Sequence, residues 1–209
     1  MSEKTYLAVN DWLIDAGGGR MIPVIKDKKY TVEDYYNTSE DDHVELINGV
    51  FYDMASPSRK HQRISMQLSI LIGNYIRENN GPCQAYAAPF GVQLSAEDET
   101  TIVEPDISVI CDKDKLTERG CIGAPDWIIE IVSRGNPAND YIRKLNLYMK
   151  AGVRLYWIVD PDTESVAVYD FENKILAPAE FSFDDKITVG IYKDFSIDFS
   201  EIKKGDSIS

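Results

Sequence analysis

The sequence predicts an α/β fold with a mixed central β-sheet flanked by helices. Two runs, WIIEIV at 127–132 and LYWIV at 155–159, are apolar on both faces. Such runs are typical of strands in the middle of a sheet that is covered on both sides. The residues between them predict a helix that runs to about Ala151 and stops at Gly152, which favours a right-handed crossover between two parallel strands.

Local signals predict further elements on both sides of this unit. Asn48-Gly49 separates the apolar-rich runs VELI and VFYDM, and this pair favours a tight hairpin because both turn positions need positive φ. Ser58 is a candidate cap for a helix that reaches about Asn79. Asn136-Pro137 is typical of the start of the crossover helix. Further strands are expected near 84–87, 91–94, 106–111 and 165–169.

Composition is that of an ordinary globular domain, with 44% hydrophobic and 27% charged residues in 209. No apolar run reaches membrane-spanning length and no export signal is visible, so we expect a cytoplasmic protein with no membrane partner. The three cysteines, Cys83, Cys111 and Cys121, are odd in number and show no C-x-x-C spacing. We therefore expect free thiols, without a disulfide framework or a structural zinc site.

The net charge of −13 is unfavourable for a protein that binds nucleic acid. The charge is nevertheless uneven along the chain. Basic residues gather in segments 58–77 and 134–154, and acidic residues gather in 39–45, 97–106 and the C-terminal tail. This pattern fits a basic rim around an acidic centre, and it fits a solvated surface with no partner equally well.

Glu130 is the most informative residue because it lies inside an apolar strand. A buried carboxylate is costly unless it is paired or bound to a metal. Asp106 opens another predicted strand, so the two acids can meet on neighbouring strands. Two close carboxylates repel each other, and a divalent cation resolves this repulsion. Their oxygen ligands suit Mg²⁺ or Mn²⁺.

Lys144 lies on the helix that follows the strand of Glu130. A lysine at such a centre can orient a water molecule or stabilise negative charge that develops on a phosphate. Asp140, one helical turn earlier, offers an alternative interpretation. The two residues would then form an exposed ion pair of little energetic value.

Three ordered stretches carry a family resemblance: EPDISVICDKDKL, APDWIIEIVS and DYIRKLNLYMKAGVRLYWIVDP. Together with ELINGVFYDMASPSRKHQRI, they resemble the Uma family of proposed restriction endonucleases, which belongs to the PD-(D/E)XK nuclease superfamily. The resemblance spans about 30–171 and implies a restriction-endonuclease-like core. We therefore expect one nuclease-like domain over 1–209, with that core and a strand-rich C-terminal extension over 172–209.

The resemblance also implies roles for individual residues. Asp106 matches the Asp of the PD element and Glu130 matches the second acid, so both would be catalytic residues and metal ligands. Glu45 matches an early acid and would be a third catalytic carboxylate and metal ligand. The superfamily pattern expects a lysine where this chain has Val132. In the Uma family the lysine is moved to the next helix, which gives Lys144 the catalytic role.

His61 is a secondary candidate for contact with phosphate or for proton transfer, although a lone histidine on a helix is more often structural. Trp127, Tyr156 and Trp157 are expected in the core. Tyr148 is expected to be a packing residue as well.

These observations favour an endonuclease that hydrolyses phosphodiester bonds in DNA with Mg²⁺ or Mn²⁺ as its cofactor. The superfamily implies a 5′-phosphate and a 3′-hydroxyl as products, and a duplex cutter would be expected to work as a homodimer. The alternative is a catalytically inactive protein of the same fold that acts as a DNA-binding or protein-interaction module. Action on RNA or a nucleotide is a third possibility.

Overall fold

The computed structural model describes residues 6–9, 12–15, 21–23, 29–38, 43–133, 139–175, 177–192 and 194–204. For the first three segments and for 139–142 it describes the backbone path alone. The crossover helix is described from Asn139 onward, so the predicted cap at Asn136-Pro137 lies outside the described residues, as does the side chain of Asp140.

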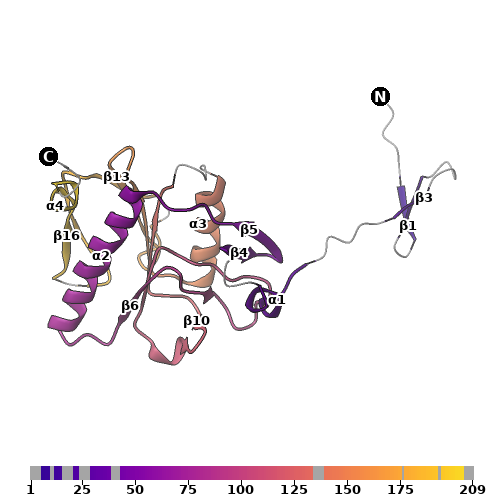
Figure 1. Cartoon of the computed structure of the whole chain (residues 1–209), viewed down its shortest axis with the longest axis horizontal. Helices are drawn as coiled ribbons and strands as arrows, with labels where there is room; N and C mark the ends of the chain where they lie inside the picture. Colours follow the sequence, from indigo (N-terminus) through magenta and orange to yellow (C-terminus); the bar gives the residue numbers. More distant parts are fainter. Residues whose placement is uncertain are drawn as a thin grey trace.

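The central sheet is mixed, as predicted, and the described residues contribute six strands in the order β14-β13-β12-β11-β8-β6 (Figure 1). Strands β11 and β12 run parallel, and every other neighbouring pair in this sheet is antiparallel. The bounds of the six strands are β6 Gln84–Ala87, β8 Ile107–Ile110, β11 Trp127–Ile131, β12 Leu155–Asp160, β13 Ser165–Asp170 and β14 Ala179–Ser182.

Two long helices cover opposite faces of this sheet (Figure 1). Helix α2, Arg59–Glu78, packs its buried isoleucine and leucine side chains on one face. Helix α3, Asn139–Ala151, joins β11 to β12 and covers the other face. Successive side chains of β11 point to opposite faces of the sheet, so Trp127 and Ile129 face α2 while Ile128 faces α3. Trp127, Tyr156 and Trp157 are fully buried, as expected.

The predicted hairpin is present as strands β4, Val44–Ile47, and β5, Val50–Asp53. Asn48 and Gly49 form its turn with φ of 52° and 82°, the positive angles that this pair was expected to supply. The predicted cap of α2 is confirmed, since the side chain of Ser58 accepts a hydrogen bond from the backbone N–H of His61 at 3.2 Å.

The remaining elements are short. Helix α1, Val32–Tyr36, precedes the hairpin, and η1, Lys113–Lys115, follows β8. The other elements are β1 Tyr6–Val9, β2 Trp12–Asp15, β3 Met21–Pro23, β7 Val92–Gln93, β9 Leu116–Thr117, β10 Gly120–Ile122, β15 Lys186–Thr188, β16 Ser196–Asp198 and α4 Phe199–Lys204.

The described part of the C-terminal segment contains β14, β15, β16 and α4 and contributes directly to the main core. Strand β14 extends the central sheet by pairing with β13. Phe183, Ile187, Phe199 and Ile202 are buried in the same apolar cluster as the inner face of α2. The segment after 171 therefore completes the cover on the α2 side of the sheet.

The expectation of three free thiols is wrong. Cys83 and Cys111 form a disulfide bond, and Cys121 is a free, buried thiol. The two bonded residues flank β6 and β8, which pair antiparallel with Gln84 opposite Ile110. This register places Cys83 opposite Cys111, 28 positions away in the sequence. An odd number of cysteines means that they cannot all form disulfide bonds within the chain, but it does not exclude one disulfide bond between neighbouring strands.

Helix α2 is the longest described helix, yet it is too polar to cross a membrane, and none of the other described helices has the length and apolar character to do so.

The core between α2 and the sheet gives a direct stability test. Leu68 is 0% exposed, whereas Met66, two residues earlier on the same helix, is 63% exposed. We expect Leu68→Ala to lower the free energy of unfolding by about 2–5 kcal/mol, because the substitution leaves a cavity in a close-packed core. Met66→Ala should change it by less than about 1 kcal/mol. Chemical denaturation followed by circular dichroism measures both values, and equal losses would contradict this packing.

Candidate active site

One cavity is lined by every residue that the sequence predicts to be catalytic or metal-binding. It has a volume of about 260 Å³ and lies where β11 and the segment before β8 meet the hairpin, α2 and α3. Its lining includes the following predicted residues: Glu45, His61, Asp106, Glu130 and Lys144. The loop from β5 to α2 and the Ala88-Pro89 segment complete the wall.

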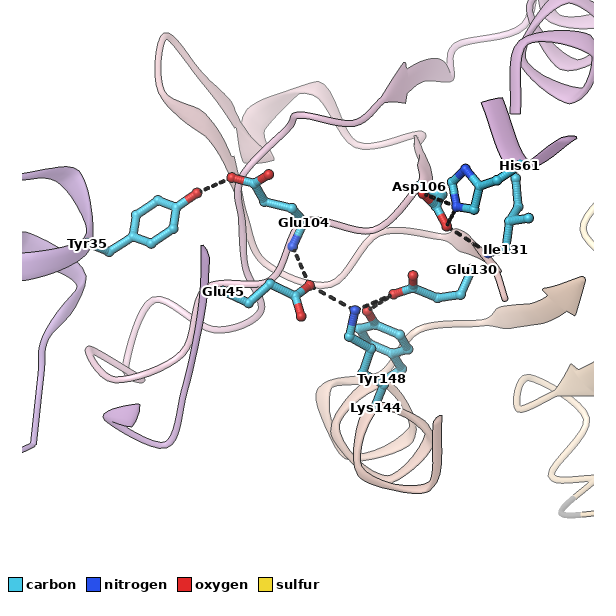
Figure 2. Close-up of polar contacts among 9 residues, drawn as sticks. All are labelled: Tyr35, Glu45, His61, Glu104, Asp106, Glu130, Ile131, Lys144 and Tyr148. Atoms are coloured by element: carbon cyan, nitrogen blue, oxygen red, sulfur yellow. Dashed lines mark hydrogen bonds and ion pairs between the residues drawn. The ribbon is translucent and has the colours of Figure 1, made fainter. Parts of the chain in front are cut away.

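Lys144 lies between two carboxylates at the base of this cavity (Figure 2). Its Nζ donates hydrogen bonds to Oε1 of Glu45 at 2.9 Å and to Oε1 of Glu130 at 3.1 Å. Glu45, Glu130 and Lys144 are 4%, 6% and 5% exposed. Ion pairs this deep are screened little by water, so each charge depends strongly on its partners.

The Glu130 carboxylate has a second donor that the sequence did not reveal. The hydroxyl of Tyr148 donates to Glu130 Oε1 at 2.6 Å, and Tyr148 is fully buried. Tyr148 was expected to be a packing residue only. The helical spacing of four residues from Lys144 was the available signal, because it places both side chains on the same face of α3.

Asp106 stands opposite Glu130 on the neighbouring strand. In the antiparallel pair of β8 and β11, Ile107 faces Ile129, so the next step of the register brings Asp106 to Glu130. Asp106 Oδ2 accepts a hydrogen bond from the backbone N–H of Ile131 at 2.7 Å. Asp106 directly precedes β8, so the register agrees with the expectation that the two acids meet at neighbouring strands.

His61 reaches the same carboxylate from the first turn of α2. Its Nε2 lies 3.1 Å from Asp106 Oδ1 and 3.2 Å from Oδ2, and His61 is buried (Figure 2). A carboxylate can only accept here, so Nε2 carries the proton in this pairing. The helix cap at Ser58 holds this first turn in place and thereby the imidazole.

The hairpin brings Glu45 to the site through backbone pairing. Leu46 exchanges two backbone hydrogen bonds with Ile102, at 2.9 and 2.7 Å. This pairing sets β4 against the segment that leads to Asp106. Glu45 Oε1 consequently accepts the backbone N–H of Glu104 at 2.9 Å in addition to Lys144. Glu104 itself accepts a hydrogen bond from the hydroxyl of Tyr35, a residue of α1 (Figure 2).

The surroundings raise the pKa of Glu130 and the pKa of His61. Burial, together with the nearby charges of Asp106 and Glu45, raises the pKa of Glu130 to about 7, although Lys144 and the Tyr148 hydroxyl oppose this shift. Burial alone would lower the pKa of His61. The hydrogen bond to Asp106 and the charges of Asp106 and Glu130 outweigh burial, and the pKa of His61 is raised.

Comparison with known proteins shows to which family the chain belongs. The model of the Uma2 family, described as "Putative restriction endonuclease", matches residues 32–200, which is most of the chain. The chain belongs to the Uma2 family. That match covers α1, the hairpin, all six strands of the central sheet and every residue of the site named above.

Two individual proteins extend the comparison. A crystal structure of a "putative nuclease belonging to DUF820" from Anabaena variabilis superposes with a TM-score of 0.68, at 22% identity, over 83% of this chain and 97% of that chain. This likeness establishes the nuclease-like fold. The "Uncharacterized protein slr1290" from Synechocystis is 30% identical over 104 residues, which are 50% of this chain. The matched region covers 53% of that relative, so the chain spans about half its length.

The donor set of this Uma2 chain fits a divalent cation in its chemistry. Asp106 and Glu130 offer carboxylate oxygens at one end of the sheet. Burial is the main cause of the raised pKa of Glu130, and the negative charge of Asp106 raises it further. Within the described residues, no three side chains from His, Cys, Asp and Glu converge as ligands. A cation held there would rely on few protein oxygens and complete its shell with water or phosphate, which is typical of Mg²⁺.

The basic segments noted in the sequence are largely engaged with the protein itself. Arg63 donates to the backbone carbonyl of Ile202 at 2.8 Å, and Lys60 donates to the carbonyl of Pro161. The guanidinium of Arg143 lies over the ring of Tyr52 at 4.3 Å, beside the cavity. The basic segments therefore contribute to tertiary structure as well as to surface charge.

The shifted groups predict how stability depends on pH. The raised pKa of Glu130 means that the folded chain binds this proton more tightly than the unfolded chain between pH 4.5 and about 7. Stability should therefore fall as pH rises through that window. His61 acts in the same direction, because its raised pKa gives stability that is lost above that pKa.

Between pH 5.5 and pH 8 the free energy of unfolding of the wild type should fall. In Glu130→Gln we expect this fall to be smaller by on the order of 2 kcal/mol. The reason is that glutamine does not ionise, so this residue's share of the pH dependence disappears. Urea denaturation at the two pH values measures the effect. An identical pH dependence in the two proteins would contradict the environment assigned to Glu130.

Removing the Lys144 ammonium should strongly destabilise the fold. Lys144→Met would leave two buried carboxylates without their shared cation, and breaking a buried pair in this way costs about 3–5 kcal/mol. Lys150→Met, at an exposed position on the same helix, is the matched control and should cost less than about 1 kcal/mol. Thermal denaturation of both variants compares them, and a Lys144→Met protein as stable as the control would rule out this buried network.

Proposed function

We propose that this Uma2 chain is a metal-dependent endonuclease that hydrolyses phosphodiester bonds in DNA. The observation that carries the proposal is the convergence of Asp106, Glu130 and Lys144 at one cavity from three different elements. Membership of a family described as "Putative restriction endonuclease" and a nuclease-like fold support it. Mg²⁺ or Mn²⁺ is the proposed cofactor, with Asp106 and Glu130 as its ligands. Glu45 was expected to be a third ligand, but among the described residues it does not converge with these two acids, and its carboxylate accepts from Lys144 instead.

A bound divalent cation would polarise the scissile phosphate and lower the pKa of an attacking water. The chain's own residues prepare the surroundings for this chemistry. The backbone N–H of Ile131 fixes the orientation of the Asp106 carboxylate. Lys144 places a positive charge beside Glu130, where it can stabilise the negative charge that develops on the phosphate.

His61 has a supporting role in this proposal. Its proton lies on the nitrogen that faces Asp106, so the imidazole holds this carboxylate together with the backbone N–H of Ile131. A protonated His61 also adds a positive charge near the phosphate, and the raised pKa of His61 favours that form.

A second candidate function has its own support. Lys144 pairs with both Glu45 and Glu130, and His61 faces Asp106, so each of these carboxylates already has a partner within the chain. The net charge of −13 is also unfavourable for holding a DNA backbone. A protein of the same fold that acts as an interaction module without cleavage would show both features.

DNA is the proposed substrate partner, and a homodimer is the proposed assembly. A single site cuts one strand, so a two-strand break is most simply made by two copies related by a two-fold axis. Sedimentation in the presence and absence of duplex DNA addresses the assembly independently of cleavage.

Plasmid cleavage separates the two candidate functions. With Mg²⁺ or Mn²⁺ present, we expect supercoiled plasmid to be nicked or linearised by the wild type, and Asp106→Ala to lower the rate at least about 100-fold because a ligand is lost. Asp114→Ala, an exposed acid on η1 outside the cavity lining, is the matched control and should cleave like the wild type.

Gel electrophoresis over a time course, with a chelator as a further control, gives the rates. Intact plasmid after incubation of the wild type with either metal would favour the interaction module. Cleavage that persists in Asp106→Ala would indicate a contaminating nuclease or a different site.

A further inference from the structure

We propose that Tyr148 is a positioning residue for Glu130: its hydroxyl fixes one carboxylate oxygen and thereby directs the other toward the divalent cation. This inference rests on the proposed function, because it assumes that Glu130 is a ligand.

Only one of the two carboxylate oxygens of Glu130 accepts hydrogen bonds from the described residues. Both the Lys144 ammonium and the Tyr148 hydroxyl donate to Oε1, at 3.1 and 2.6 Å. The other oxygen, Oε2, accepts no hydrogen bond from the part of the chain that the structure describes, and it points away from both donors (Figure 2). Glu130 lines the cavity together with Asp106, so Oε2 is the oxygen available to a ligand.

Tyr148 is better suited than Lys144 to set this orientation. A tyrosine side chain has few rotatable bonds, and the ring of Tyr148 packs edge-on against Tyr156 with 5.0 Å between ring centroids. Tyr148 is fully buried, and its hydroxyl bond to Glu130 is shorter than the lysine bond. Lys144 is shared with Glu45, so its ammonium alone would hold Glu130 less rigidly.

The consequence for binding follows from how ligand orientation is held. A carboxylate that is free to rotate must lose that freedom when it binds a cation, and this loss weakens the affinity. Groups that orient a metal ligand typically contribute 10–100-fold in affinity or activity. Magnesium and manganese demand a well-defined ligand geometry, which makes such a constraint effective.

Calorimetric titration of Mn²⁺ into wild-type, Tyr148→Phe and Tyr192→Phe proteins tests this inference. Tyr192→Phe is the matched control, because its hydroxyl is buried without a hydrogen-bond partner in the described structure and lies outside the cavity lining. We expect the Kd for Mn²⁺ to rise about 10–100-fold in Tyr148→Phe and to stay within twofold of wild type in Tyr192→Phe. Circular dichroism confirms that each protein is folded.

A plasmid-cleavage series adds a readout that a purely structural role would not change. In Tyr148→Phe, the Mn²⁺ concentration for half-maximal rate should rise by the same factor as the Kd, and saturating Mn²⁺ should restore most of the rate.

Each other outcome is decisive. An unchanged Kd in folded Tyr148→Phe would overturn the positioning role and leave the proposed function intact. A Tyr148→Phe chain that does not fold would also overturn it, because the hydroxyl would then be required by the fold. A wild type that binds no Mn²⁺ would overturn the proposed metal dependence and this inference together.

Discussion

The ammonium of Lys144, buried between Glu45 and Glu130, is the interaction on which the site depends. Two carboxylates so close together in a dry environment repel each other, and one internal cation relieves that repulsion for both. The three residues come from the hairpin, the central sheet and α3. The same contact therefore joins three parts of the fold and defines the base of the cavity.

This internal cation also explains how an acidic centre persists in a folded chain before any ligand binds. Glu130 remains poised, with its pKa raised to about 7, because the attraction of Lys144 only partly offsets burial and the charges of Asp106 and Glu45. A divalent cation would add the missing positive charge on the side of Asp106. Such a cation would lie on the side of the Glu130 carboxylate away from Lys144.

Much of the framework follows from the sequence because local physics determines it. The hairpin at Asn48-Gly49 follows from turn geometry, and the start of α2 follows from the side chain of Ser58. The position of Glu130 within an apolar strand was itself the evidence for a site, since a carboxylate there requires a partner. The family resemblance pointed to a lysine on α3 in place of one at Val132, and the structure brings Lys144 of that helix to Glu130.

Contacts that depend on how distant segments pair with one another could not be predicted from the sequence. The Cys83–Cys111 bond requires that β6 pair with β8 in one particular register. Tyr148 was indistinguishable from a packing residue, because its ring does pack and only its hydroxyl reaches Glu130. The link from Tyr35 to Glu104 joins residues 69 positions apart and leaves no periodic trace in the sequence.

The central claim is that Asp106 and Glu130 form one cation site beside Lys144. Crystals soaked in Mn²⁺ and measured at a wavelength with manganese anomalous signal test it most directly. We expect one anomalous peak within metal-coordination distance of an oxygen of each carboxylate, on the side of Glu130 away from Lys144. The absence of a peak at this cavity, or a peak bound elsewhere on the chain, would contradict it.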